Sequence, residues 1–293
     1  MSTSQLFSIL IANYNNGKYL TDAIGSVYAQ TYTNWEIILV DDASTDNSKE
    51  LYKELEKDAR IHIFYNEENK GCGYTKRRCA ELANGEICGF LDPDDMLLPN
   101  AIEAHVTEHI NRKNISCVFS RYYNCDENMT VFSELRLLQI GESLTYFTNR
   151  DYAPEHFVTF KKRDYDKTEG ISADIKLGVD QDLYFKLEEV APIFVLNMFT
   201  YKYRHANGIS QGNANAAFYW NLIVRHRTCI RRNLNPNDYP IKDFEDFDGM
   251  YLSKYNKSVQ TIDEILNSYS YRFGYFLLTP LRWIKMLLKK KQQ

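Results

Sequence analysis

The sequence predicts an α/β fold: a mostly parallel central sheet flanked by helices, with a helical C-terminal extension. The chain has 293 residues, of which 44% are hydrophobic and 25% are charged, so it can bury a substantial apolar core. Its first half alternates short apolar runs with amphipathic stretches, the pattern expected of parallel strands joined by helices.

Five short apolar runs are predicted strands, at residues 7–12, 36–41, 61–65, 87–91 and 116–120. The stretches between them are predicted helices, near residues 19–28, 47–57, 74–83 and 100–111. Leu51 and Leu55 are spaced four apart, as are Ile102 and Val106, so each pair shares one face of its helix. Each helix would therefore pack one face on the sheet.

Residues 127–179 have weak periodicity and many aromatic side chains, and we interpret them as a variable segment that faces the substrate. A helix over residues 182–189 and a strand over residues 193–203 are predicted to follow. Beyond Ala214 the pattern is helical. The 22 tyrosines are a surplus, and tyrosine combines an apolar face with a hydroxyl group that suits sugars and bases.

Charge is unevenly distributed along the chain. The net charge is −4, yet residues 271–293 contain six basic side chains and no acidic one. The acidic remainder argues against nucleic-acid binding, which requires a basic footprint. The basic tail is amphipathic and too short and too charged to span a bilayer. We expect it either to lie on an anionic membrane surface or to pack on the main domain.

The cysteines and the N-terminus favour a cytoplasmic location. The six cysteines form no CxxC pair and no zinc-like spacing with the histidines, as expected of reduced thiols. The first apolar run is short and has no basic flank, so no secretory signal is predicted. A tail on the membrane surface would place the protein at the inner face of the cytoplasmic membrane.

Polar clusters follow three of the predicted strands, at residues 13–15, 41–42 and 92–95. Ligands of such sheets bind beyond the carboxyl ends of the strands, so the clusters are expected to converge on one edge. No glycine-rich turn follows the first strand, which excludes a dinucleotide fingerprint and a P-loop. A phosphate-bearing ligand would then need another positive charge, such as a divalent metal held by carboxylates.

Each acidic cluster also has a purely structural interpretation. Asp92, Asp94 and Asp95 could form an acidic turn that caps the next helix. Asp41 and Asp42 could form a solvated strand end. Taken one at a time, the clusters leave both interpretations open.

Three segments together resemble family 2 glycosyltransferases with the GT-A fold: residues 7–15 (FSILIANYN), 40–46 (VDDASTD) and 90–95 (FLDPDD). Their order, spacing and position at strand ends agree with that family. The resemblance covers about residues 7–210. It implies a glycosyltransferase domain over residues 1–210, with a nucleotide-sugar half (1–121) and an acceptor and catalytic-base half (122–210). Residues 211–293 would be the helical extension.

The resemblance implies roles for residues at the donor site. Asn13 and Tyr14 would lie along the edge of the base, and Asp42 would form a hydrogen bond with it. Uracil is the expected base. Asp92 would lie close to the donor ribose. The same donor site would include Ala12, Asn15, Asp41 and Pro93.

Two further residues would be metal ligands. Asp94 would bind the Mn²⁺ or Mg²⁺ that bridges the diphosphate, and His205 matches a late histidine that reaches the metal or the diphosphate. A lone histidine after a strand also has a structural interpretation.

Two positions depart from the family pattern. Lys76 occupies the place where an arginine normally approaches the donor, which keeps the charge but loses the planar fork. Either Lys76 or Arg77 could serve there. Asp180 matches the residue that takes the acceptor proton, but Val179 replaces the acid that usually precedes it. Without the resemblance, capping of a helix N-terminus would account for Asp180.

The resemblance thus implies an inverting transfer of a sugar from a nucleoside diphosphate sugar to a hydroxyl of a saccharide or lipid-linked acceptor. The expected donor is a UDP-sugar. Two other functions stay open at this point. A nucleotidyltransferase also uses acidic metal ligands on an α/β sheet, but ordinarily carries a glycine-rich phosphate loop. A catalytically silent nucleotide- or carbohydrate-binding module would need no base at Asp180.

Overall fold

The computed structural model describes residues 5–135, 141–142, 146–147, 156–205 and 214–235. The strands are β1 (Phe7–Asn13), β2 (Trp35–Asp41), β3 (Ile61–Tyr65), β4 (Ile87–Phe90), β5 (Met96–Leu97), β6 (Cys117–Cys125), β7 (Val131–Glu134), β8 (Gly141–Glu142), β9 (Thr159–Lys161) and β10 (Ile193–Arg204). The helices are α1 (Gly17–Tyr28), α2 (Ser48–Leu55), α3 (Cys72–Leu82), α4 (Ala101–Asn111), α5 (Lys162–Tyr165), α6 (Val179–Glu188) and α7 (Ala214–Arg231).

The strands form one mixed sheet in the order β3-β2-β1-β4-β9-β6-β10-β5, with β7 paired to β6 and β8 paired to β10. Strands β3, β2, β1 and β4 are mutually parallel, and β6 runs parallel to β10. The short β9 lies between these two parallel groups and is antiparallel to both β4 and β6. The predicted α/β fold with a mostly parallel sheet is confirmed, while β9 is an element that the sequence did not predict.

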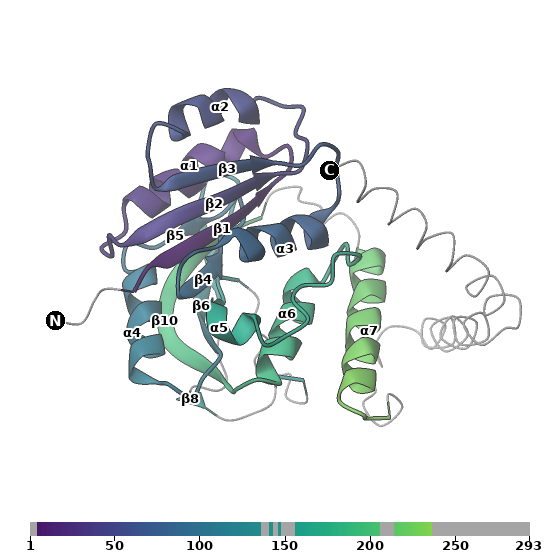
Figure 1. The fold of residues 1–293 in the computed structure, drawn as a ribbon. Coiled ribbons are helices and arrows are strands. Elements are labelled where there is room, and N and C mark those ends of the chain that lie inside the picture. Colours follow the sequence, from purple (N-terminus) through teal and green to yellow (C-terminus); the bar gives the residue numbers. More distant parts are fainter. Residues whose placement is uncertain (1–4, 136–140, 143–145, 148–155, 206–213, 236–293) are drawn as a thin grey trace, which may run out of the picture. The chain divides into compact units, whose positions relative to one another are not determined.

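Helices cover both faces of the first parallel group (Figure 1). On one face, Leu20 and Ile24 of α1 share a core cluster with Ile9 of β1, Ile37 of β2 and Ile102 of α4. Helix α3 packs on the opposite face of β1 and β2. Burial on both faces explains why the runs that form these strands are continuously apolar.

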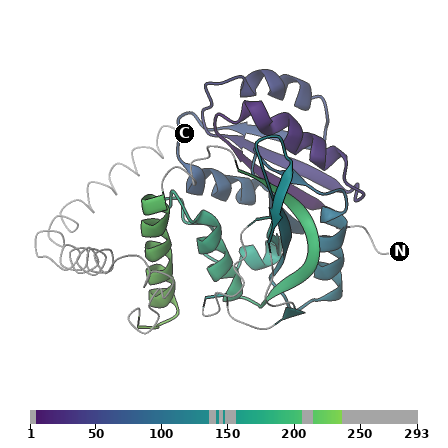
Figure 2. The same ribbon diagram turned by 180° about the vertical axis from the view of Figure 1, so that it is seen from behind.

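Strand β10 is long and curved and forms most of its pairing with β6 (Figure 2). Two register shifts, between Leu196 and Phe199 and between Phe199 and Tyr201, interrupt that pairing. Such irregularities bend a strand and re-aim its side chains. The C-terminal end of β10 is thereby brought beside the turn that follows β4, where Tyr201 and Arg204 contact Asp95.

The predicted helices of the first half are present as α1 to α4, and the helix predicted beyond Ala214 is α7. The helix predicted over residues 182–189 begins earlier, at Val179, because Gly178 adopts the left-handed conformation (φ 71°) and ends the preceding loop. Asp180 therefore lies inside the first turn of α6.

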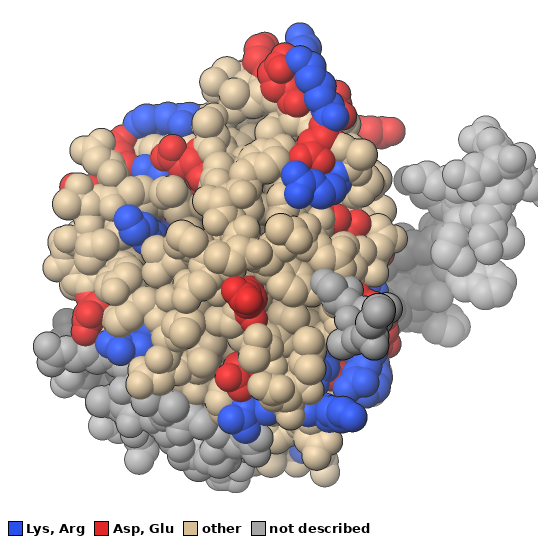
Figure 3. All heavy atoms as spheres, turned by 90° about the vertical axis from the view of Figure 1, so that its left-hand side faces the viewer, with Lys and Arg blue, Asp and Glu red and all other residues tan. Residues whose placement is uncertain are grey.

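No helix among the described residues is long and apolar enough to cross a membrane. Residues 271–293, the predicted amphipathic tail, lie outside the described residues. On the face shown in Figure 3, acidic and basic side chains are interspersed over a largely uncharged surface.

Candidate active site

An acidic turn follows β4 at the edge where the parallel strands end. The backbone N–H of Asp95 donates to the Asp92 carbonyl (3.1 Å), and Pro93 between them is buried. The carboxylate of Asp95 is fully buried and accepts hydrogen bonds from the Tyr201 hydroxyl and the Arg204 backbone N–H, both at 2.7 Å. Asp95 thus anchors the turn to β10.

Arg204 fixes the same turn from a second direction. Its buried guanidinium donates to the backbone carbonyl of Asp94 (2.6 Å), to the carboxylate of Asp22 on α1 (2.7 Å) and to the backbone carbonyl of Glu127. It also lies over the Tyr19 ring, 4.4 Å from the centroid. One side chain therefore ties the acidic turn to α1 and to the loop between β6 and β7.

Asp94 is the member of the turn whose carboxylate is left available. Among the described residues, no side chain donates a hydrogen bond to it. Burial and the adjacent Asp92 carboxylate raise the pKa of Asp94 to about 6. A carboxylate held close to another one without a cation is a position that a divalent metal would satisfy.

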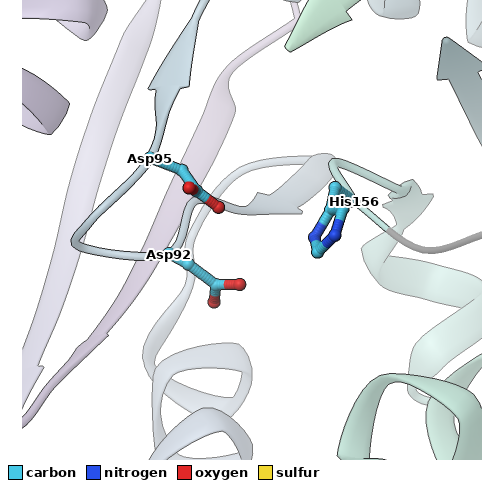
Figure 4. Close-up of side chains that lie close together, drawn as sticks. All are labelled: Asp92, Asp95 and His156. Carbon is cyan, nitrogen blue, oxygen red and sulfur yellow. The ribbon is translucent and has the colours of Figure 1, made fainter. Parts of the chain in front are cut away.

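A second grouping of possible metal ligands includes a residue that the sequence did not suggest. Ligand atoms of Asp92, Asp95 and His156 all lie within 4.8 Å of one another, and the Asp92 carboxylate faces the imidazole (Figure 4). The His156 ring stacks on Tyr203 at 3.9 Å and lies parallel to Tyr201 at 5.8 Å between centroids. His156 precedes β9 in the aromatic segment, and no local pattern marks it as a site residue.

Lys76 of α3 connects the acidic turn to α6. Its Nζ lies 2.8 Å from Asp180 Oδ1 and 3.1 Å from Asp92 Oδ1, and its side chain is 7% exposed. Burial opposes the charge on Lys76, but the two carboxylates raise its pKa well above the ordinary value. Arg77 points elsewhere and donates to Glu81 and to the carbonyls of residues 169 and 171. Of the two basic candidates, Lys76 is therefore the one at the acidic turn.

The carboxylates of Asp92 and Asp180 respond differently to this shared ammonium. Burial favours the neutral form of Asp92, but Lys76 and His156 outweigh it and lower its pKa. At Asp180, burial and the nearby Asp92 carboxylate outweigh Lys76, so the pKa of Asp180 is raised above its ordinary value. A general base benefits from such a shift, because a higher pKa brings it closer to the working pH.

The loop that leads to Asp180 is held by a buried ion pair. Lys186 Nζ donates to Asp182 Oδ2 (2.7 Å), to the Gly170 carbonyl and to Ser172 Oγ (both 2.8 Å). The loop also fits tightly against α3, since a Cβ on Gly73 would lie 2.3 Å from the Ile175 carbonyl oxygen. Asp182 therefore has a structural role, while Asp180 on the same helix faces Lys76.

On the donor side, Asp42 shapes a loop and retains acceptor capacity. Its Oδ1 accepts from Asn66 Nδ2 (2.7 Å) and the Lys70 N–H (2.8 Å), and its Oδ2 accepts from the Gly71 N–H (2.8 Å). A carboxylate offers about four acceptor positions, so roughly one remains on Oδ2. Asp42 can hold the 66–71 loop and still accept one more hydrogen bond.

Three other predicted donor-site residues are engaged within the protein. Asn13 Nδ2 donates to Ser48 Oγ and the Tyr52 hydroxyl, and Tyr52 donates to Asp41 Oδ2 (2.6 Å). Asn15, with a positive φ of 54°, accepts from the Thr45 N–H (2.8 Å). These residues shape the strand ends. Ala12, half-buried, and Tyr14, 38% exposed, lie next to them.

Acidic residues from two strand ends and from α6 contact the N-terminal half of α3 or the residue before it. Asp42 Oδ2 accepts from the N–H of Gly71, the residue before α3, and Lys76 of α3 pairs with Asp92 and Asp180. Cys72 begins α3, one turn before Lys76. Asp42 and Asp92, from two of the polar clusters at the strand ends, therefore lie near the N-terminal half of α3, as does Asp180.

His205 lies just beyond β10. Its Nε2 is 2.8 Å from Asn124 Oδ1, and its ring contacts Phe132 and Tyr203 edge-on. It does not belong to the described grouping of Asp92, Asp95 and His156. Its role as a metal ligand stays a prediction from the family resemblance.

The sheet has acidic residues at the ends of its first parallel group, and β9 joins that group to the parallel pair β6 and β10, an arrangement that agrees with the expected GT-A fold. The family model for glycosyl transferase family 2 matches residues 8–168, more than half of the chain. The chain belongs to this family.

Known proteins similar to this chain are glycosyltransferases. The Escherichia coli chondroitin synthase is 31% identical over 200 residues, which are 67% of this chain and 28% of that protein. The Escherichia coli UDP-Glc:alpha-D-GlcNAc-diphosphoundecaprenol beta-1,3-glucosyltransferase WfgD is 35% identical over 127 residues, 43% of this chain and 49% of that protein. This chain thus spans less than half of the length of either relative.

Solved structures share the fold. S. aureus TarS, residues 1–349, in complex with UDP superposes with a TM-score of 0.63 at 18% identity, covering 80% of this chain and 68% of that one. At this level of identity the likeness concerns the architecture alone, and it confirms the GT-A fold.

Proposed function

We propose that this protein is an inverting glycosyltransferase that moves a sugar from a nucleoside diphosphate sugar, with uridine as the base, to an acceptor hydroxyl. The observation that carries the proposal is the ion-pair network through Lys76. It joins Asp92, at the strand end that would face the donor, to Asp180, the candidate base on α6. Family membership, and the UDP bound by the structurally similar S. aureus TarS, support the donor class.

For the donor, we assign the base to the edge formed by Ala12, Tyr14 and Asp42. Tyr14 offers an exposed ring, and Asp42 offers the remaining acceptor position on Oδ2. Asn13, Asn15 and Asp41 would form the floor of this pocket through their internal hydrogen bonds. Pro93, buried in the acidic turn, would shape its ribose side with Asp92.

The acidic turn fits Mn²⁺ or Mg²⁺. Asp94 would hold the cation, because its carboxylate has a raised pKa and no side-chain donor among the described residues, whereas Asp95 is occupied by Tyr201 and Arg204. His205 remains the second ligand that the family resemblance implies. When bound, such a cation neutralises the negative charge that develops on the departing diphosphate.

For the chemistry, Asp180 would accept the proton of the acceptor hydroxyl while that oxygen attacks the anomeric carbon. The nucleoside diphosphate leaves from the opposite face, so one displacement inverts the anomeric centre. We propose a saccharide or lipid-linked acceptor and a role in cell-surface polysaccharide or glycolipid synthesis, in line with the names of the relatives. The cytoplasmic location, with a tail on the membrane surface, belongs to the same proposal.

A screen of nucleotide sugars tests the function. Purified protein is incubated with UDP-, GDP- and dTDP-sugars, with Mn²⁺, Mg²⁺ or EDTA, and released nucleoside diphosphate is measured. We expect metal-dependent release of UDP that rises when a suitable acceptor is added. UDP binding without any release would favour a silent binding module. In parallel reactions with nucleoside triphosphates and a sugar 1-phosphate, release of inorganic pyrophosphate would favour a nucleotidyltransferase.

A further inference from the structure

We propose that Lys76 is a shared cation: the Asp180 carboxylate holds its ammonium in the free protein, and the diphosphate of the donor competes with Asp180 for it. Donor binding would thereby release the base for the acceptor. This inference rests on the proposed function. It assigns to Lys76 a positioning role for Asp180 in addition to contact with the donor.

The contacts of Lys76 restrict where its charge can be satisfied. The ammonium lies 2.8 Å from Asp180 Oδ1, 3.1 Å from Asp92 Oδ1 and 5.1 Å from the centre of the Phe90 ring. Its side chain is 7% exposed, so water can replace few of these contacts. A buried ammonium that loses a carboxylate partner needs another anion in its place.

The three charged groups differ in their freedom to move. The Asp180 side chain is 37% exposed and so has access to solvent, whereas the Lys76 side chain is only 7% exposed. Asp92 is 34% exposed, but it belongs to the turn that Asp95 and Arg204 anchor to β10. The contact between Lys76 and Asp180 is therefore the one that can open.

The net charge of the site favours opening of the contact between Lys76 and Asp180 when the donor binds. Two carboxylates share one ammonium, so the network already carries excess negative charge before a ligand enters. A diphosphate adds further negative charge and is a strong acceptor for an ammonium group. The lowest-energy arrangement with the donor bound then pairs Lys76 with phosphate and leaves Asp180 free to accept a proton. The donor should consequently bind before the acceptor is activated.

A double-mutant cycle on UDP affinity tests this. The dissociation constant of UDP is measured by calorimetry with Mn²⁺ for the wild type, Asp180→Asn, Lys76→Met and the double variant. We expect Asp180→Asn to bind UDP about five-fold more tightly or better, because the competitor is gone, a size typical of coupling between two sites. In the Lys76→Met background, Asp180→Asn should change the affinity less than two-fold. If Asp180 instead repelled the diphosphate directly, Asp180→Asn would still tighten UDP binding in the Lys76→Met background. That result would overturn the proposal.

Two controls keep the outcome interpretable. Asp174→Asn removes an exposed carboxylate of the 170–178 loop that pairs with Arg227, and it should leave UDP affinity unchanged. Uridine, which has no phosphate, should bind the wild type and Asp180→Asn equally. This comparison remains valid even if the Lys76→Met variant does not fold. Equal UDP affinity of the wild type and Asp180→Asn would overturn the inference, whereas no UDP binding by any variant would contradict the proposed function itself.

Discussion

The donor edge and the region that carries Asp180 reach the same site by different means. At the donor edge, strands β1, β2 and β4 are parallel neighbours, so their carboxyl ends place Asn13, Asp42 and Asp92 together by sheet geometry alone. Asp180 lies in a helix that follows a long irregular loop. Its position depends on a left-handed glycine, a buried ion pair and the close approach of the loop to Gly73.

This difference indicates which half is vulnerable to substitution. The strands of the donor edge are supported by backbone pairing, which a single side-chain change does not remove, and only its acidic turn depends on the side chains of Asp95 and Arg204. The base region is supported by a few buried side chains, each of which is needed. Substitutions behind Asp180 should therefore damage catalysis without weakening the donor pocket.

The largest effect is expected from the base itself. Asp180→Asn removes the proton acceptor and should lower kcat by about 100- to 10,000-fold, the range typical of general-base catalysis. Steady-state transfer kinetics would measure it, with Asp174→Asn as the matched carboxylate control. A kcat above one tenth of the wild-type value would remove Asp180 from the mechanism.

The ion pair behind the base should come next. Lys186→Met leaves the Asp182 carboxylate, 1% exposed, buried without its cation, which typically costs about 3–5 kcal/mol. Urea unfolding would measure the loss. Lys18→Met, which breaks the exposed pair with Glu127, should leave the unfolding free energy nearly unchanged, because solvent screens such a pair. If the folded Lys186→Met protein lost UDP affinity as much as kcat, the separation of the two regions would be wrong.

Arg204 tests how the acidic turn is held at the donor edge. Arg204→Met removes charge-assisted hydrogen bonds to the Asp94 and Glu127 carbonyls and should cost about 2–3 kcal/mol of unfolding free energy. Arg204→Met should also weaken Mn²⁺ binding, because the acidic turn that carries Asp94 would no longer be held in place by Arg204. Asp22→Asn, which loses only a half-exposed partner of Arg204, should cost less than about 1 kcal/mol. Equal losses in both variants would mean that Arg204 acts through Asp22 alone.

A pH-dependent effect on stability is expected from two buried histidines under β9. Burial lowers the pKa of His105 to about 3 and that of His109 well below its ordinary value. Unfolded histidines titrate near about 6.5, so the unfolded chain binds more protons below that pH, and stability falls as pH decreases from about 6.5 toward 3. The loss is up to about 1.4 kcal/mol per pH unit for each histidine. Urea unfolding at pH 7 and 5 should show a smaller difference for His109→Gln than for the wild type.

The sequence predicted best what depends on local pattern. The strands β1 to β4, the start of β6 and four helices follow from periodicity, and the strand-end carboxylates follow from the topology that these elements imply. Strand β9 was missed because it has three residues and pairs with β4 and β6 through contacts distant in sequence. The early start of α6 was missed because it depends on the left-handed conformation of Gly178.

The site was predicted in outline. The family resemblance suggested both Lys76 and Asp180, but these residues are 104 positions apart, and only folding brings their side chains together. His156 lies in an aromatic segment without regular pattern, so no signal marked it. The sequence does not show that Asp95 and Asp182 hold the fold together and do not bind a ligand. An aspartate can do either, and only its contacts in the folded protein distinguish the two roles.

The central claim is that acidic side chains at this edge bind a nucleoside diphosphate through a divalent cation. Calorimetric titration of UDP into the wild type and Asp94→Asn, with and without Mn²⁺, tests it directly. We predict that Mn²⁺ strengthens UDP binding at least ten-fold in the wild type and less than two-fold in Asp94→Asn. An equal effect of Mn²⁺ on both proteins, or none on the wild type, would contradict this account of the site.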